Sequence, residues 1–263
     1  MEPLAQWPDE AVRGIRGVLT DIDDTLTAEG QIEAPALAAL HALRAAGIAV
    51  VAITGRPVDW SEPFARTWPL AAIVAENGSV ALQVGSDGGL RKHYQQDERT
   101  RRENFARMQQ VLARIEREVP GACRARDSAG RETDIAIDHS EFTQLPQLAI
   151  EAVVRLMQAE GMRATISSIH INGWYGTHDK FTGAQWIVRE LWGRELSAER
   201  LHWVYVGDST NDQVMFRHMV HSVGVANILR FKDQLAHPPR YITQAERGLG
   251  FAELAARLLS QPS

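Results

Sequence analysis

The stretch Gly17–Thr27, GVLTDIDDTLT, joins an apolar run to three carboxylates within four positions, Asp21, Asp23 and Asp24. Like charges this close repel one another unless a positive group lies among them. A hard divalent cation such as Mg²⁺ prefers oxygen ligands and would neutralise the cluster. An acidic turn that caps the next helix would give the same letters, so the cluster alone suggests a metal site without deciding for it.

Composition narrows the class of protein. The chain has 263 residues, 44% hydrophobic and 23% charged, enough for one large domain or two smaller ones. A net charge of −5 gives no general attraction to nucleic acid or anionic membranes, so we expect a small-molecule partner and neither of those. The single Cys123 excludes an intrachain disulfide. The N-terminal residues lack signal-peptide and transmembrane patterns, so we expect a cytoplasmic protein of unknown oligomeric state.

Strand and helix patterns alternate in the first part of the chain. Buried strands are predicted at 15–23, 48–55 and 71–77, and helices at 34–47 and 58–68. This order predicts an α/β fold with a doubly wound parallel sheet, in which functional groups gather at the carboxyl ends of the strands. Asp21 and Thr54 fall at such ends.

The alternation of predicted strands and helices ends near Asp97. A charged helix at 97–119 and a second helix at 145–161 are each followed by two strand-like runs, at 122–127, 133–138, 162–168 and 169–176. We interpret this αββαββ block, residues 97–175, as an inserted cap domain. Glu and Asp interleave with the arginines of the first helix, which favours a solvated face over a nucleic-acid surface.

The sheet pattern then returns, so the core is discontinuous, at 1–96 and 176–263. A helix is predicted at 179–193 with Lys180 near its start, and an apolar strand within 201–216 leads into an acidic loop carrying Asp208 and Asp212. Two further strands, at 221–227 and 240–243, and a closing amphipathic helix at 245–259 complete the core.

These motifs resemble those of the haloacid dehalogenase (HAD) superfamily: DIDDT, the Thr of ITGR, a downstream Lys and GDSTND, in that order. The αββαββ insertion is similar to that of the Cof-type, or IIB, branch, which includes many sugar phosphatases. The ENG within AENGS adds to the resemblance and makes Asn77 a candidate substrate-binding residue. Lys180 lies in GTHDKFTGA, which departs from the KG context common in that branch.

The resemblance implies roles in phosphoryl transfer. Asp21 would be the nucleophile that forms an aspartyl-phosphate, and Asp23 the general acid and base. Thr54 would bind a phosphoryl oxygen, and Lys180 would neutralise charge on the phosphoryl group and on the nucleophile. Arg56, which follows the second motif, is interpreted as structural.

A cofactor follows from the same resemblance. Mg²⁺ would be held by Asp21, the backbone carbonyl of Asp23 and Asp208, with Asp212 a further ligand or a neighbour of the ligands. Asp24 occupies the variable position of DxDxT and is interpreted as structural.

The implied function is a Mg²⁺-dependent phosphatase of small phosphomonoesters, with sugar phosphates as the leading substrate class. A phosphosugar mutase or phosphotransferase would keep the aspartyl-phosphate and return it to a product. A non-enzymatic phosphoacceptor module is a third possibility, because acidic pockets with Thr and Lys also occur in signalling receivers. The natural substrate stays open among sugar, polyol and glycerate-type phosphates.

Alternation along the cap strands predicts which side chains face the active site. Successive side chains on a strand point to opposite faces, so the isoleucines at 135, 137, 169 and 171 should pack on the two cap helices. The predicted substrate-facing residues are Asp134, Asp138, His170 and Asn172. If Arg124 and Arg126 share that face, they would suit an acidic substrate instead.

Overall fold

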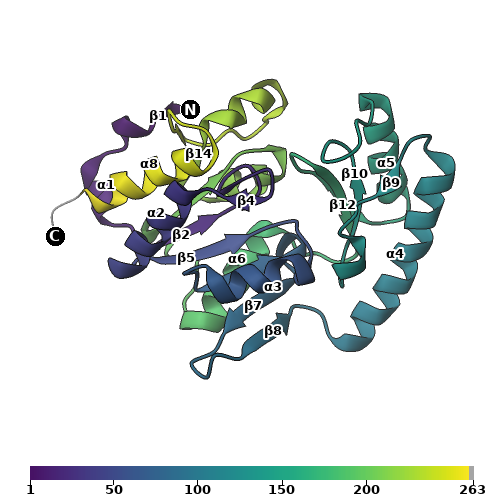
Figure 1. Ribbon diagram of the computed structural model, residues 1–263, viewed down its shortest axis with the longest axis horizontal. Helices are drawn as coiled ribbons and strands as arrows, with labels where there is room; N and C mark the ends of the chain where they lie inside the picture. The colour runs from purple at the N-terminus through teal and green to yellow at the C-terminus, as the bar shows by residue number, and fades with distance from the viewer. Residues whose placement is uncertain (261–263) are drawn as a thin grey trace.

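A mixed sheet forms the centre of the molecule in this computed structural model, which describes residues 1–260 (Figure 1). Within those residues nine strands follow the order β1-β15-β14-β13-β2-β5-β6-β7-β8. Neighbours from β1 to β6 run parallel, whereas β6, β7 and β8 pair antiparallel. The strands are β1 Glu2–Pro3, β2 Gly17–Thr20, β5 Ala49–Ile53, β6 Ala72–Ala75, β7 Val80–Val84, β8 Leu90–Tyr94, β13 Trp203–Gly207, β14 His221–Gly224 and β15 Tyr241–Ile242.

Helices cover both faces of this sheet, which confirms the predicted doubly wound α/β fold. The alternation is visible in β5, where Val50 and Ala52 belong to the apolar cluster on one face and Val51 and Ile53 to the cluster on the other. One cluster is covered by α1 Asp9–Arg13, α2 Ala34–Ala45, α3 Val58–Thr67 and α8 Arg247–Leu259, and the other by α6 Lys180–Trp192 and α7 Gln213–His218. The antiparallel hairpin β7–β8 was not anticipated from the sequence.

A second, antiparallel sheet lies beside the first, in the order β11-β12-β10-β9. Its strands are β9 Cys123–Arg124, β10 Ile135–Asp138, β11 Arg163–Ile166 and β12 His170–Trp174. Helices α4 Glu98–Glu118 and α5 Gln147–Ala159 lie on its outer side, away from the large sheet (Figure 1). The chain enters this block after β8 and leaves it before α6. The bounds of the inserted domain, 97–175, stay a prediction.

Three of the four cap isoleucines pack as the alternation predicts. Ile135, Ile137 and Ile171 join the apolar cluster between the small sheet and its helices. Ile169 is the exception. It precedes β12 in a turn where the amide of His170 donates to Ser167 Oγ, and it lines a cavity on the opposite side instead. The period of two applies only inside the strand, which is why the prediction for Ile169 is wrong.

A two-residue ribbon, β3 Thr27–Ala28 with β4 Gln31–Ile32, follows the opening acidic stretch. No helix within residues 1–260 has both the length and the apolar character needed to cross a membrane.

Candidate active site

Three predicted residues meet at one edge of the large sheet. Asp21 comes directly after β2, Thr54 directly after β5 and Asp208 directly after β13. Strand β2 pairs in parallel with β5 on one side and with β13 on the other. Parallel neighbours end at the same edge, so the topology alone gathers these three side chains. All three are buried.

Lys180 reaches the same edge because α6 begins there. Asp179 caps the helix: its side chain accepts from the amide of Thr182, and Thr182 Oγ1 accepts from the amide of Asp179. The helix start lies tightly against the ENG turn, since a Cβ on Gly183 would lie 2.5 Å from Gly78 Cα. Gly78 itself has φ +112°, a conformation that favours glycine. The two glycines therefore allow the close approach that brings Lys180 into the site.

Lys180 bridges two carboxylates. Its Nζ lies 2.7 Å from Asp21 Oδ1 and 2.7 Å from Asp212 Oδ1. The other oxygen of Asp212 accepts from the amides of Asp208 and Ser209. Burial raises the pKa of Asp21 to about 7, and the nearby Lys180 only partly offsets this effect. Keeping these buried carboxylates charged therefore costs free energy unless a cation lies beside them.

The acidic group has the donor chemistry of a cation site. Oxygen atoms of Asp21, Asp208 and Asp212 lie within 4.8 Å of one another, and all three residues are buried. Among the described residues, Asp208 Oδ1 is buried without a hydrogen-bond partner. Burial, together with the charges of Asp212 and Asp21, raises the pKa of Asp208 well above its ordinary value. One ammonium group for three carboxylates leaves negative charge that a divalent cation would balance.

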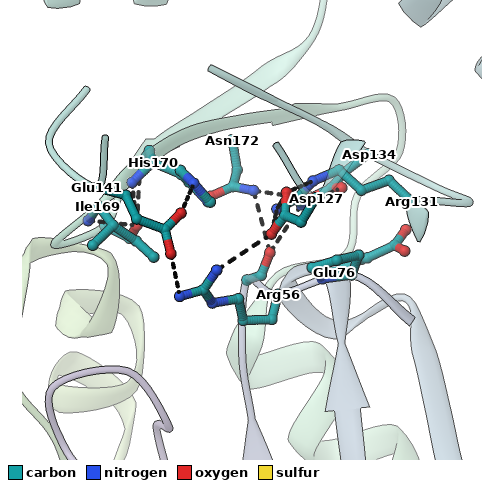
Figure 2. Close-up of polar contacts among 12 residues, drawn as sticks. Arg56, Glu76, Asp127, Arg131, Asp134, Glu141, Ile169, His170 and Asn172 are labelled. Carbon is teal, nitrogen blue, oxygen red and sulfur yellow. Dashed lines mark hydrogen bonds and ion pairs between the residues drawn. The ribbon is translucent and has the colours of Figure 1, made fainter. Parts of the chain in front are cut away.

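Arg56, which was interpreted from the sequence as structural, contacts Asp23 directly and also contacts the cap block. Its Nε lies 3.0 Å from both carboxylate oxygens of Asp23, and its Nη2 lies 2.9 Å from Asp23 Oδ1. On its other side it reaches Glu141 and Asp127 from the cap block (Figure 2). Its backbone amide donates to Thr54 Oγ1 at 3.0 Å, which leaves the hydroxyl proton of Thr54 available for another acceptor.

The predicted substrate-binding residues Asn77 and Asp134 lie instead in a buried polar network. Asp134 Oδ2 accepts from the side chains of Asn77, at 3.3 Å, and Asn172, at 3.0 Å, and its Oδ1 accepts from Arg131. Asn172 and Arg131 also donate to the carbonyl of Gly55, which lies between Thr54 and Arg56 in the second motif. Asp134 is fully buried and both of its oxygens have partners within the protein, so its role in substrate binding stays a prediction.

Asp138 and His170 also have partners within the protein. Asp138 accepts from the amides of Ser140, Glu141 and Phe142, so its carboxylate holds the segment after β10. His170 Nε2 lies 2.9 Å from Glu141 Oε2. Alternation predicted the face of the small sheet from which these side chains project. It gave no information on the loop after β10, whose residues contact them there.

The two cap arginines point elsewhere. Arg124 forms a two-pronged ion pair with Glu116 of α4, on the helix side of the small sheet. Arg126 is exposed and lies over the ring of Phe142, 3.8 Å from its centroid. Phe142 lines the larger cavity described below, so the acidic-substrate alternative stays a prediction for Arg126, whereas Arg124 is occupied by Glu116.

Two cavities adjoin the predicted catalytic residues. One, of about 10 Å³, is lined by Asp21, Asp23 and Thr54 from the core and by His170 and Asn172 from the cap block. It has room for about one water molecule. The second measures about 310 Å³ and continues past Asp23; its wall comprises Asp23, Asp24, Glu29, Gly30, Arg56, Ser140, Glu141, Phe142, Ile169 and Arg247. Within residues 1–260, Asn77, Asp134 and Asp138 line neither of these cavities.

Sequence reasoning missed several residues at this site. Asn227 Nδ2 donates to Asp208 Oδ2 and to the carbonyl of Asp24, and Arg247 pairs with the Asp24 side chain at 2.9 Å. Glu141 was also missed. These residues lie outside the four motifs, in segments that follow β10, β14 and β15, so only the folded chain brings them together.

Comparisons with known proteins agree with this geometry. Residues 18–106 match the family model of haloacid dehalogenase-like hydrolases. A search of curated proteins gives no match. The chain is similar in fold to a protein of Thermoplasma acidophilum, with a TM-score of 0.71 and 16% identity over 93% of this chain and 98% of that one.

Two further solved structures extend the likeness. A sucrose-phosphatase of Synechocystis sp. PCC6803, in complex with sucrose and phosphate, gives a TM-score of 0.65 at 17% identity over 94% of this chain and 98% of that one. A Plasmodium vivax protein described as HAD/COF-like gives 0.67 at 16% identity over 97% and 99%. At these identities the solved structures show the fold alone.

Proposed function

We propose that this chain, haloacid dehalogenase-like in its motifs and its fold, is a Mg²⁺-dependent phosphatase of small phosphomonoesters that works through an aspartyl-phosphate. The observation that carries the proposal is the contact of Lys180 Nζ with both Asp21 and Asp212, beside the unpartnered oxygen of Asp208. A nucleophilic carboxylate, a fixed cation and further carboxylates in one buried site are the parts that phosphoryl transfer needs.

The chain's own residues support two half-reactions. In the first, an oxygen of Asp21 forms a bond to phosphorus while the bond to the leaving oxygen breaks, and Asp23 gives that oxygen a proton. In the second, Asp23 takes a proton from water as the water attacks phosphorus, which releases phosphate and restores Asp21. Thr54, whose hydroxyl proton is available, and Lys180 would bind the phosphoryl oxygens.

The residues fit a bound Mg²⁺. Asp21, Asp208 and Asp212 supply the carboxylate oxygens that this ion prefers, and the buried negative charge calls for a cation. The backbone carbonyl of Asp23 is proposed as a further ligand. When bound, the ion would neutralise charge that develops on the transferring phosphoryl group.

The larger cavity supports a small hydroxylated leaving group. Its volume of about 310 Å³ lies at the lower end of the range typical of small-molecule sites, about 300–1,000 Å³. Its wall carries charged side chains next to the proposed acid Asp23, and carboxylates and guanidinium groups bind sugar hydroxyls well. We therefore propose sugar phosphates as the substrate class. The 10 Å³ space at Asp21 is too small for a phosphoryl group, so entry requires the cap block to move.

Phosphate release from p-nitrophenyl phosphate tests the proposal. We expect turnover with Mg²⁺, none in excess chelator, and none from Asp21→Asn, with Asp87→Asn in the exposed β7–β8 turn as the matched control. Mass spectrometry of the quenched enzyme should find phosphate on the wild type and not on Asp21→Asn. A single turnover without release would favour a phosphoacceptor module, and full activity in chelator would contradict the metal assignment.

A further inference from the structure

The guanidinium of Arg56 lies between the proposed acid and base and a carboxylate of the cap block. Its Nε and Nη2 face Asp23, at 2.9–3.0 Å. The same Nη2 lies 2.9 Å from Glu141 Oε1, and Nη1 lies 3.4 Å from Asp127. Figure 2 shows the Arg56 head group directed at these cap carboxylates. Only 6% of the Arg56 side chain is exposed, so it has little freedom to adopt another position.

Glu141 is itself held on both of its oxygens. Oε1 accepts from Arg56, and Oε2 lies 2.9 Å from His170 Nε2. Burial opposes its charge, but the contacts with His170 and Arg56 outweigh burial and lower the pKa of Glu141 to about 2. Its backbone is fixed as well, because the amide of Glu141 donates to Asp138. A continuous chain of contacts therefore runs from the cap strand β12 to Asp23.

We infer that Arg56 is a positioning residue for Asp23, and that Glu141 holds Arg56 in the orientation that aligns Asp23 with the leaving oxygen. This inference rests on the proposed phosphatase function. Glu141 belongs to the cap block and Arg56 to the core. Asp23 is therefore fully aligned only when the cap block lies against the core, so that Glu141 contacts Arg56 as it does here.

The physical reason lies in the geometry of the arginine. Its donors form a rigid planar fork, so an anchor on one edge fixes the direction of the other. Arg56 lines a cavity of about 310 Å³, so without Glu141 its head group has space to turn away from Asp23. Asp23 would then lose the partner that faces both of its oxygens. Proton transfer needs a heavy-atom separation of about 2.6–3.2 Å, so a small rotation of Asp23 is enough to slow it.

A direct contact between Glu141 and the substrate is the competing explanation, because Glu141 also lines that cavity. The two explanations differ in one measurable respect. A positioning role slows the release of every leaving group that needs a proton, whether or not it carries hydroxyls. A binding role requires a leaving group with hydroxyls to bind, and it would raise KM for sugar phosphates alone.

The experiment compares Glu141→Gln with wild type across aryl and alkyl phosphates that lack sugar hydroxyls. The readout is the rate of leaving-group release in a single turnover, because this reports the first half-reaction alone, whereas Asp23 acts as the base in the second half-reaction for every substrate. Good leaving groups such as dinitrophenolate need no proton, so their release rate should stay within about twofold. Poor leaving groups such as simple alkoxides should be released roughly 10- to 100-fold more slowly, at or below the factor of about 10² to 10⁴ that general acid catalysis supplies. The dependence of the release rate on leaving-group basicity therefore becomes steeper.

Matched variants keep the test decisive. Glu116→Gln removes the same charge from an arginine ion pair on the far side of the cap sheet, and its leaving-group dependence should equal that of wild type. Arg56→Ala should be as steep as Glu141→Gln, with added guanidinium chloride restoring part of the rate on poor leaving groups. Equal losses of Glu141→Gln in the single-turnover release of all leaving groups, or a KM effect confined to sugar phosphates, would overturn the inference while the phosphatase proposal stands. Absence of turnover in wild type would reject both.

Discussion

Lys180 contacts Asp21, 159 residues earlier in the chain, and Asp212, 32 residues later, each at 2.7 Å. A single ammonium group thus joins the end of β2 to the loop after β13 through the start of α6. Each residue type could be read from its motif, but the pairing depends on the parallel topology and on the close contact between Gly78 and Gly183.

Removal of this buried cation should be strongly destabilising. We expect Lys180→Met to lower the free energy of unfolding by about 3–5 kcal/mol, because it leaves buried carboxylates without their partner. Urea denaturation measures this directly. Lys92→Met is the matched control: Lys92 pairs with Glu62 and Glu132, but all three side chains are about one-third exposed, so its loss should be about 1 kcal/mol or less. Equal losses in the two variants would contradict the buried ion-pair interpretation.

Metal binding should be visible without any substrate. A Mg²⁺ ion at the proposed site would bind the folded protein and not the unfolded chain, so Mg²⁺ should raise the thermal midpoint, and the rise should grow with ion concentration. Asp208→Asn removes the carboxylate with the unpartnered oxygen and should abolish most of the rise, whereas Asp87→Asn should leave it unchanged. Circular dichroism melts in chelator and in MgCl₂ provide the measurement. A full rise in Asp208→Asn would place the ion elsewhere.

The sequence predicts the core of this site well because its signals are local. Asp21, Thr54 and Asp208 each follow a buried apolar run, and a parallel sheet brings strand ends together whatever the loops do. Alternation also predicted which side chains of β10 and β12 pack against the cap helices. These inferences need only the period of a strand and the order of the elements.

The rest depends on loop conformation and could not be predicted in the same way. Asp138 lies on the expected face, yet its oxygens accept from three amides of the following turn. Glu141 lies in that turn, outside any strand or helix, so no hydrophobic periodicity predicts where its side chain lies. The hairpin β7–β8 was missed because β8 has no fully buried residue and carries charged side chains, so it lacks the apolar run that marks a buried strand.

Stability should depend on pH through Glu76, which is fully buried beneath the cap block. Burial, reinforced by Asp134, raises its pKa from 4.5 to about 7 despite contacts from Thr133 and Arg131. The folded state therefore holds this proton more tightly than the unfolded chain. The stability that Glu76 contributes is complete below about pH 4.5 and is lost as the pH rises through about 7.

Comparison with Glu76→Gln isolates this effect. Between pH 4.5 and 7 the wild type should lose about 3 kcal/mol relative to the variant, because each pKa unit corresponds to about 1.4 kcal/mol. Denaturant unfolding at several pH values measures the difference. The absolute stability of the variant is not the readout, since the amide cannot accept all the backbone hydrogen bonds that the carboxylate does. A difference that stays constant with pH would mean that Glu76 ionises at its ordinary value.

Asn172 gives the last prediction, and the structure changes what the sequence suggested. As part of a substrate-facing roof, it should affect a sugar phosphate far more than a generic phosphate. Its amide instead donates to the carbonyl of Gly55 and to Asp134, and Gly55 separates Thr54 from Arg56.

Asn172→Ala should therefore lower kcat on p-nitrophenyl phosphate and on sugar phosphates alike, by roughly tenfold, because a small displacement of the second motif misplaces Thr54. Thr165→Ala is the matched control. Thr165 lies opposite Asn172 on the neighbouring strand, and its hydroxyl bonds to no other described residue. Steady-state kinetics on both substrates decide the matter. A loss confined to sugar phosphates would show that Asn172 contacts the leaving group after all, which would require its amide to leave Gly55 when substrate binds.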